Sequence, residues 1–136
     1  MTEEVMRERV AAARVGRLAT VGTGGLPHLV PFCFVAEGDV LYSAVDSKPK
    51  RTRRLQRLRN AAREPHVSVL VDHYEEDWDR LWWIRLDGRA SELPAGPEAQ
   101  RATALLAAKY RQYRERPPEG PVLRIDVERW RGWAAS

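Results

Sequence analysis

Cysteine is almost missing from this chain of 136 residues, in which Cys33 is the only one. A lone thiol can form neither an internal disulfide nor a cysteine-based zinc site. Long apolar runs are missing as well: none approaches the roughly 18 residues that a membrane-spanning helix needs, and the N-terminus lacks the apolar segment of a signal peptide. We therefore expect a cytoplasmic protein that has no membrane partner.

Motifs that carry chemistry on their own are also missing. The three histidines, His28, His66 and His73, lack the spacing of metal ligands, so we expect no metal. No Walker A sequence and no G-x-S-x-G motif occurs. The glycine cluster of residues 22–25 precedes a predicted strand rather than a helix, which makes it a turn and not a dinucleotide-binding loop. Any reaction chemistry would therefore have to come from a bound cofactor.

Positive charge is what the sequence concentrates in one place. Lysine and arginine outnumber aspartate and glutamate by 23 to 19, which gives a net charge of +4. Eight basic residues and no acidic one lie between Lys48 and Arg63, so the rest of the chain sums to −4. Pro49 suits a helix start, and the free backbone N–H groups and the dipole of a helix start favour an anion. The segment therefore predicts a phosphate or polyanion clamp.

Two other interpretations of the basic segment stay open on its residues alone. Its arginines could form a solvated helix face that pairs with the acidic remainder of the chain. The segment could also bind a nucleic acid. We rank that interpretation last, because the aromatic residues are not interleaved with the arginines and the rest of the chain is acidic. We expect no nucleic-acid partner.

The periodicity of the sequence predicts an α+β, mainly β, fold over residues 1–136 as one domain. Strands joined by short turns must run antiparallel, because a parallel pair needs a long crossover. Closing such a sheet, fully or in part, into a small barrel removes exposed edges. The prediction has about six strands (17–21, 28–35, 40–45, 67–71, 81–89 and 122–127) and three helices (2–14, 50–63 and 98–113).

Tryptophan is frequent, with five in the chain. Trp78, Trp82 and Trp83 lie close together, and Trp130 and Trp133 lie near the C-terminus. Neighbouring residues of a strand point to opposite faces of a sheet, so one of Trp82 and Trp83 belongs to the core. The other is free to line a groove or a subunit interface. Core packing accounts for most of the five, and one of them could stack on a planar ligand.

Five short motifs follow one another in an order that a known superfamily shares. They are GRLATV (16–21), GLPHLVPF (25–32), SKPKRTRRL (47–55), EPHVSVLVD (64–72), and the run of DHY, DW and LWW within 72–83. Together they resemble the pyridoxamine 5'-phosphate oxidase-like split β-barrel superfamily, which has the FMN-binding type of split barrel. The last motif is most similar to the subgroup that depends on the deazaflavin coenzyme F420.

This resemblance implies a cofactor site shared between two copies of the chain. In the superfamily, the stretch after the third strand and the basic helix bind the cofactor phosphate, and the first two strands lie along the ring. Members lack an obvious side-chain acid or base, so we assign no catalytic residue. The cofactor-binding residues implied here are Leu18, Ala19, Thr20, Pro31, Phe32, Ser47, Lys48, Lys50, Arg51, Thr52, Trp78 and Trp83.

The resemblance thus implies a homodimeric F420-dependent oxidoreductase, with the cofactor at the dimer interface, that transfers a hydride between the deazaflavin and a small organic acceptor. FMN stays an alternative cofactor, and a flavin or F420 carrier without turnover stays an alternative function. We expect F420 because its oligoglutamate tail suits the extra arginines. The oxidases that act on pyridoxamine phosphate carry a C-terminal arginine-and-histidine stretch. This chain has no such histidine after Arg129, so we do not expect that substrate.

Overall fold

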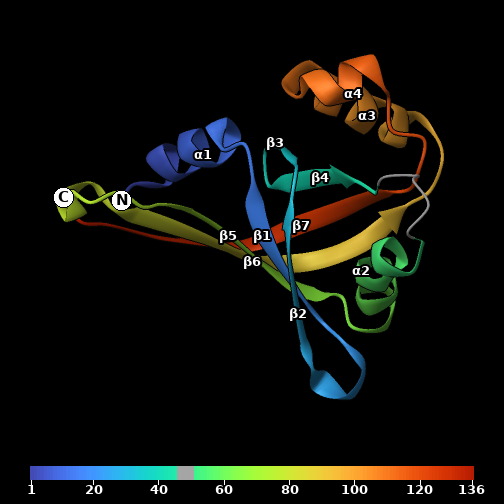
Figure 1. Ribbon diagram of the computed structural model, residues 1–136, viewed down its shortest axis with the longest axis horizontal. Helices are drawn as coiled ribbons and strands as arrows, with labels where there is room; N and C mark the ends of the chain where they lie inside the picture. The colour runs from blue at the N-terminus through green and yellow to red at the C-terminus, as the bar shows by residue number, and fades with distance from the viewer. Residues whose placement is uncertain (46–50) are drawn as a thin grey trace.

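A seven-stranded antiparallel sheet forms the body of the protein (Figure 1). The structure is a computed structural model that describes residues 1–45 and 51–136, and the side chains of all of these except 51–55. Across the sheet the strand order is β2-β1-β5-β6-β7-β4-β3. The strands are β1 (Gly16–Val21), β2 (Pro27–Phe32), β3 (Val35–Glu37), β4 (Val40–Ala44), β5 (His66–His73), β6 (Trp82–Leu93) and β7 (Val122–Ala134).

The two edge strands of this sheet are consecutive in the chain. β2 and β3 lie at opposite edges, yet only Cys33 and Phe34 separate them in sequence. The sheet must therefore curl until its edges approach each other, and it stays open there, because β2 and β3 do not pair within the described residues. The result is a split barrel of antiparallel strands with flanking helices, which confirms the predicted fold class.

The sheet has one strand more than predicted, because the predicted strand 28–35 is interrupted between β2 and β3. Phe34 is fully buried, and its backbone groups bond to distant side chains instead of to a neighbouring strand. The Tyr110 hydroxyl accepts a hydrogen bond from the Phe34 N–H at 3.1 Å, and Lys109 Nζ donates to the Phe34 carbonyl at 2.7 Å. These bonds join residues about 75 positions apart, so the local alternation of apolar and polar residues cannot predict them.

Alternation along the strands places the apolar side chains inside the barrel. In β1, Leu18 and Thr20 point inward and are buried. Arg17 and Ala19 alternate with them, and Arg17 is exposed whereas Ala19 is half-buried. Inward residues from the other strands complete one core, including Phe34, Leu41, Val69, Ile84, Leu86, Leu123 and Ile125. Burial of such side chains is the main stabilising contribution to the barrel.

Strands β5, β6 and β7 run on beyond the barrel as an extension (Figure 1). Its tip carries the short helix η2 (Trp78–Arg80), and both chain termini lie beside it. β7 continues to Ala134, paired with β6, so Trp130 and Trp133 belong to a strand and not to a tail after residue 127. The alternation of large and small side chains weakens there, which is why the sequence predicts an earlier end.

Helix α1 (Glu3–Ala12) packs against the extension. Thr2 caps it, since its hydroxyl accepts a hydrogen bond from the Val5 N–H at 3.2 Å. Met6 and Val10 are buried, and Met6 lies against Gly132 of β7. The helix ends two residues before the predicted end. Among the described residues, no helix is both long and apolar enough to cross a membrane.

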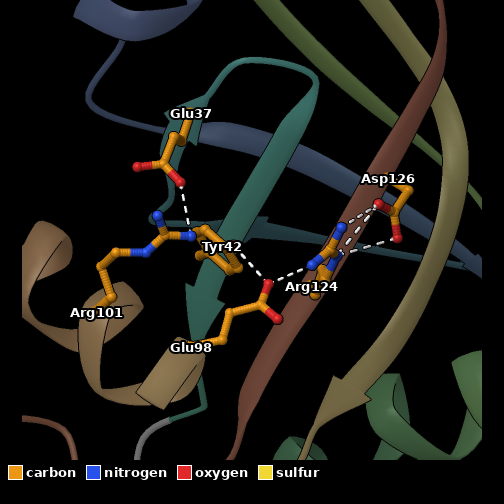
Figure 2. A network of polar contacts seen from close by, with 6 residues as sticks. All are labelled: Glu37, Tyr42, Glu98, Arg101, Arg124 and Asp126. Carbon is orange, nitrogen blue, oxygen red and sulfur yellow. Dashed lines mark hydrogen bonds and ion pairs between the residues drawn. The ribbon is translucent and has the colours of Figure 1, made fainter.

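Helix α3 (Pro97–Lys109) is tied to the barrel by a polar network (Figure 2). Glu98, in its first turn, accepts a hydrogen bond from the Tyr42 hydroxyl of β4 at 2.7 Å. Glu98 also pairs with Arg124 of β7, which in turn pairs with Asp126 at 2.8 Å. The network thereby fixes β4, β7 and α3 to one another at the wall of the barrel.

The predicted helix 98–113 is in fact two helices. Tyr110 has an extended backbone (φ −114°, ψ 122°) between α3 and α4 (Arg111–Glu115). This conformation lets the Tyr110 hydroxyl reach the backbone of Phe34 and the carbonyl of Arg14, the latter at 3.0 Å. The tertiary contact therefore overrides the helical periodicity of the sequence.

Candidate functional site

Helix α2 (Arg51–Arg63) carries the basic segment and is fixed to the barrel by its second half. Leu58 and Ala61 are buried in the core, whereas Ala62 is exposed. Asn60 is fully buried, and its amide donates to the Thr20 hydroxyl of β1 at 2.9 Å. Such a buried and satisfied polar contact fixes the rotation of the helix as well as its position.

Two further contacts hold α2 in place. The Gln56 amide donates to the Asn60 side-chain oxygen at 2.8 Å. At the end of the helix, Arg63 donates to the Thr23 hydroxyl at 2.8 Å and to the Val21 carbonyl at 3.1 Å. The far end of α2 is thus held by the β1–β2 hairpin, and the first turn of the helix follows the end of β4 in the chain.

A cavity of about 320 Å³ lies where β2, β4, α2 and α4 meet. We call it the barrel cavity. Pro31 and Phe32, both expected to contact a cofactor, line it. The Ser43 hydroxyl also lines it and donates to the Cys33 carbonyl at 2.8 Å. The full lining is Val15, Pro31, Phe32, Cys33, Ser43, Ala44, Arg57 and Tyr113.

Arg57 is the basic side chain that α2 presents to the barrel cavity. Its Nε is shielded from solvent and has no hydrogen-bond partner among the residues that the structure describes. Burial lowers the pKa of the Arg57 guanidinium, and this group is nevertheless a cation at any ordinary pH. A buried N–H donor without an acceptor is unfavourable, so an anionic group in this cavity would be stabilised by Arg57.

Sequence reasoning missed Arg57, although it is part of the basic segment. The phosphate site was predicted at the helix start, within residues 47–52, and Arg57 lies about one and a half turns later. Its spacing carries the signal in retrospect: Arg57 precedes the inward-facing Leu58 and lies three residues before Asn60, on the side of α2 that docks on the barrel. Nothing in the sequence alone tells that side from the solvated one.

The other expected cofactor residues lie in different places. Leu18 and Thr20 point into the core and do not line the barrel cavity, although Thr20 positions α2 through Asn60. Arg51 and Thr52 begin helix α2, for which only the backbone is described here. The remaining members of the predicted phosphate clamp, which are Ser47, Lys48 and Lys50, lie outside the described residues.

Ala19, Trp78 and Trp83 do not line the barrel cavity either. Ala19 and Trp83 face outward and line a second cavity of about 500 Å³ on the outer side of the sheet, with Leu29, Leu70 and others. Trp78 lies in η2 at the tip of the extension and is 65% exposed. Within one copy of the chain, the structure therefore brings Pro31 and Phe32 together with Arg57 in the barrel cavity. Trp78 and Trp83 do not line that cavity.

The outer face of the sheet exposes several large apolar side chains. Leu29 is 69% exposed and Trp133 is 46% exposed on this face, next to Leu70 and the half-buried Trp83. Trp83 and Trp133 are direct partners across β6 and β7. Exposed apolar patches of this kind mark interaction surfaces.

A split barrel with a basic helix docked on β1 and β6 defines the class of this protein. Comparison with protein families gives the same result with more detail. The family described as pyridoxamine 5'-phosphate oxidase matches residues 2–134. The chain therefore belongs to the pyridoxamine 5'-phosphate oxidase family.

One curated relative and two solved structures illustrate the similarity. The 5a,11a-dehydrotetracycline/5a,11a-dehydrooxytetracycline reductase of Streptomyces rimosus is 33% identical over 87 residues, which are 63% of this chain and 60% of the reductase. The chain thus matches about three fifths of that relative's length.

The two structures share the fold. A conserved hypothetical protein from Mycobacterium tuberculosis superposes with a TM-score of 0.78 at 22% identity, over 99% of this chain and 86% of the other. A FAD-binding protein from Mesorhizobium loti superposes with a TM-score of 0.71 at 22% identity, over 97% of this chain and 94% of the other.

Proposed function

We propose that this protein is an oxidoreductase that binds a flavin-type cofactor and transfers a hydride between the cofactor ring and a small organic acceptor. The observation that carries the proposal is the barrel cavity, in which a buried arginine N–H without a partner faces residues expected beside a cofactor. The similarity to a reductase supports the reaction class. The FAD-binding protein from Mesorhizobium loti supports the cofactor class, since it has the same fold.

We propose coenzyme F420 as the cofactor, with FMN as the alternative. Both carry a phosphate, for which Arg57 and the basic start of α2 are suitable ligands. The coenzyme F420 tail adds several carboxylates, and the further arginines of residues 51–63 supply charge for them. At about 320 Å³ the barrel cavity is at the small end of ligand pockets, so the rest of the cofactor would extend beyond it.

The chain itself contributes binding and positioning. When bound, such a cofactor supplies the hydride chemistry that no side chain can supply. Pro31 and Phe32 provide an apolar wall, Arg57 holds an anionic group, and the Asn60–Thr20 hydrogen bond keeps α2 at a fixed distance from β1. Holding the ring beside an acceptor and excluding water lowers the barrier without a general acid or base.

We also propose a homodimer, with the cofactor at its interface. The apolar outer face of Leu29, Leu70, Trp83 and Trp133 supports this proposal, because a second copy would cover it. Trp78 at the exposed tip of the extension is free to complete the partner's site. This arrangement would account for expected site residues that one copy holds far from the barrel cavity.

A binding titration tests the cofactor proposal. Quenching of tryptophan fluorescence is measured against coenzyme F420, FMN and FAD, and we expect coenzyme F420 to bind most tightly, with an affinity that weakens as salt is added. The double variant Lys50→Glu, Arg51→Glu should weaken binding at least 100-fold. Unchanged affinity in that variant would show that the helix start is not the phosphate site.

A second variant tests the barrel cavity itself. Arg57→Gln keeps a polar side chain of similar length but removes the charge, and we expect at least a tenfold loss of cofactor affinity. Arg116→Gln is the control, because Arg116 is exposed and lies outside α2, and its loss should change affinity less than twofold. Cofactor binding without reduction of any quinone or enone acceptor would favour a carrier over an enzyme.

A further inference from the structure

A second cavity, of about 390 Å³, lies at the tip of the extension between α1 and η2. We call it the tip cavity. It shares no lining residue with the barrel cavity. Most of its lining is charged or polar, which is unlike the apolar outer face of the sheet. The lining residues are Arg9, His73, Glu75, Asp79, Arg80, Leu81, Trp82, Ala134 and Ser136.

Arg9 stands out among the arginines of α1. Its guanidinium carbon lies 4.9 Å from the centre of the Trp82 ring, so the indole fixes the position of the charged group. Its Nη1 is shielded from solvent and has no hydrogen-bond partner in the part of the chain that the structure describes. Arg7, in the same helix, is by contrast paired with Glu3 and Asp39. Arg9 is therefore held in place, and no described residue forms an ion pair with it.

The acidic residues of the tip cavity do not supply a counter-ion for Arg9. The Glu75 carboxylate is paired with His73 Nε2 and also with Arg80 Nε, the latter at 3.1 Å. Asp79 makes no ion pair with Arg9 among the described residues, and its backbone carbonyl accepts a hydrogen bond from the Ser136 hydroxyl at 2.6 Å. The cavity thus contains a buried donor on a cation and lacks an acceptor for it.

We propose that the tip cavity binds a small anion, the carboxylate or phosphate group of a metabolite, with Arg9 as the residue that binds it. A guanidinium pairs well with the oxygens of both groups, and a buried donor gains most from a new acceptor. The volume admits a small metabolite. The site uses no residue of the barrel cavity, so its test does not depend on cofactor binding there.

Fluorine NMR tests this proposal at the cavity itself. The protein is labelled with 5-fluorotryptophan, and the Trp82 signal is assigned by its loss in Trp82→Phe. Sodium acetate and sodium phosphate are titrated separately at constant ionic strength. We expect a saturable shift of the Trp82 signal with at least one of them. Saturation by acetate alone would assign a carboxylate site, and saturation by phosphate alone would assign a phosphate site.

Variants identify the residue that binds the anion. Arg9→Gln should raise the half-saturating concentration at least tenfold, and Arg9→Lys, which keeps the charge, should raise it less. Arg116→Gln is the control for loss of an exposed charge elsewhere. Arg57→Gln should leave this titration unchanged even where it abolishes cofactor binding. No saturable shift in the unaltered protein, or equal half-saturation in Arg9→Gln with its other four fluorine signals in place, would overturn the proposal.

Discussion

Asn60 shows how much one buried side chain decides in this protein. Its amide donates to Thr20 and accepts from Gln56, with no exposure to solvent. Through this residue the position of α2 is coupled to β1, and Arg57, three residues earlier, takes its place in the barrel cavity. The residue contributes to function by positioning, and it touches no predicted ligand itself.

Replacing this amide should loosen the attachment of α2. We expect Asn60→Ala to lower the free energy of unfolding by about 2 kcal/mol, because it removes two hydrogen bonds and leaves buried polar groups without partners. Urea denaturation measures the change. Arg59→Ala, at an exposed position of the same helix, should change stability by less than about 0.5 kcal/mol. Equal effects of the two variants would contradict the role given to Asn60.

Lys109 gives the protein a stability that depends on pH. Burial, and secondarily the charge of Arg14, lower the pKa of Lys109 from 10.5 to about 8, so the folded protein loses this proton before the unfolded chain does. Stability should therefore rise with pH between about 8 and 10. Above that range Tyr110, whose pKa burial raises to about 12, acts in the opposite direction.

The variant Lys109→Met isolates this contribution. Denaturation curves measured from pH 7.5 to 10 should show a rising free energy of unfolding for the unaltered protein and a flatter profile for the variant. The slope is the informative quantity, since loss of the Lys109–Phe34 hydrogen bond shifts the whole curve as well. A slope that persists in the variant would assign the pH dependence to another group.

At the scale of elements, the change of register between β6 and β7 separates the barrel from the extension. Asp87 pairs with Arg129 and Gly88 with Val127, so Glu128 is the extra residue of a bulge. A bulge bends a strand and increases its twist, and here it lies where the extension leaves the barrel. The bulge therefore helps to set the direction in which the tip cavity and Trp78 project.

Gly88 makes this bulge possible, and a larger residue should disrupt it. A Cβ at position 88 would lie 2.1 Å from the Asp126 carbonyl oxygen, which is backbone and cannot rotate away. We expect Gly88→Ala to cost at least about 3 kcal/mol of stability, seen as a clear fall in the thermal midpoint. Ser91→Ala, at an exposed position of the same strand, should leave the midpoint nearly unchanged.

Most elements could be predicted from the sequence because their signals are local. The Thr2 cap, the β5 alternation of Val67, Val69 and Val71, and the extent of α2 follow from residues close to one another in the chain. The predictions that differ depend on distant partners. Phe34 interrupts the predicted strand and Tyr110 interrupts the predicted helix because these two residues hydrogen-bond to each other. The periodicity within either segment cannot predict that contact.

For the whole molecule, the basic segment and the exposed apolar side chains of the sheet lie on different elements. The basic residues gather on α2, whereas Leu29, Leu70 and Trp133 are exposed on the outer face of the sheet. The proposed dimer uses the second surface and the proposed cofactor the first. Disruption of one should therefore be separable, at least in part, from disruption of the other.

Introducing a charge into the outer face should separate the copies. We expect the unaltered protein to have twice the protomer mass of 15.6 kDa in light scattering, and Leu29→Glu to have the mass of one protomer with an unchanged circular dichroism spectrum. Leu26→Glu is the matched control, because Leu26 has the same 69% exposure but does not line the outer cavity. A monomeric unaltered protein would exclude the proposed dimer.

The sequence by itself determined the mainly β antiparallel fold and the positive charge of α2, because alternation, turns and composition are local properties. The resemblance predicted cofactor contacts for Pro31 and Phe32, and the structure shows that both line the barrel cavity. Only the tertiary structure decided that Arg57 faces that cavity and that Leu18 and Thr20 do not. It also decided that Arg9 Nη1 is buried with no hydrogen-bond partner among the described residues. The physical reason is that burial and pairing are properties of surroundings, and segments far apart in the chain supply those surroundings.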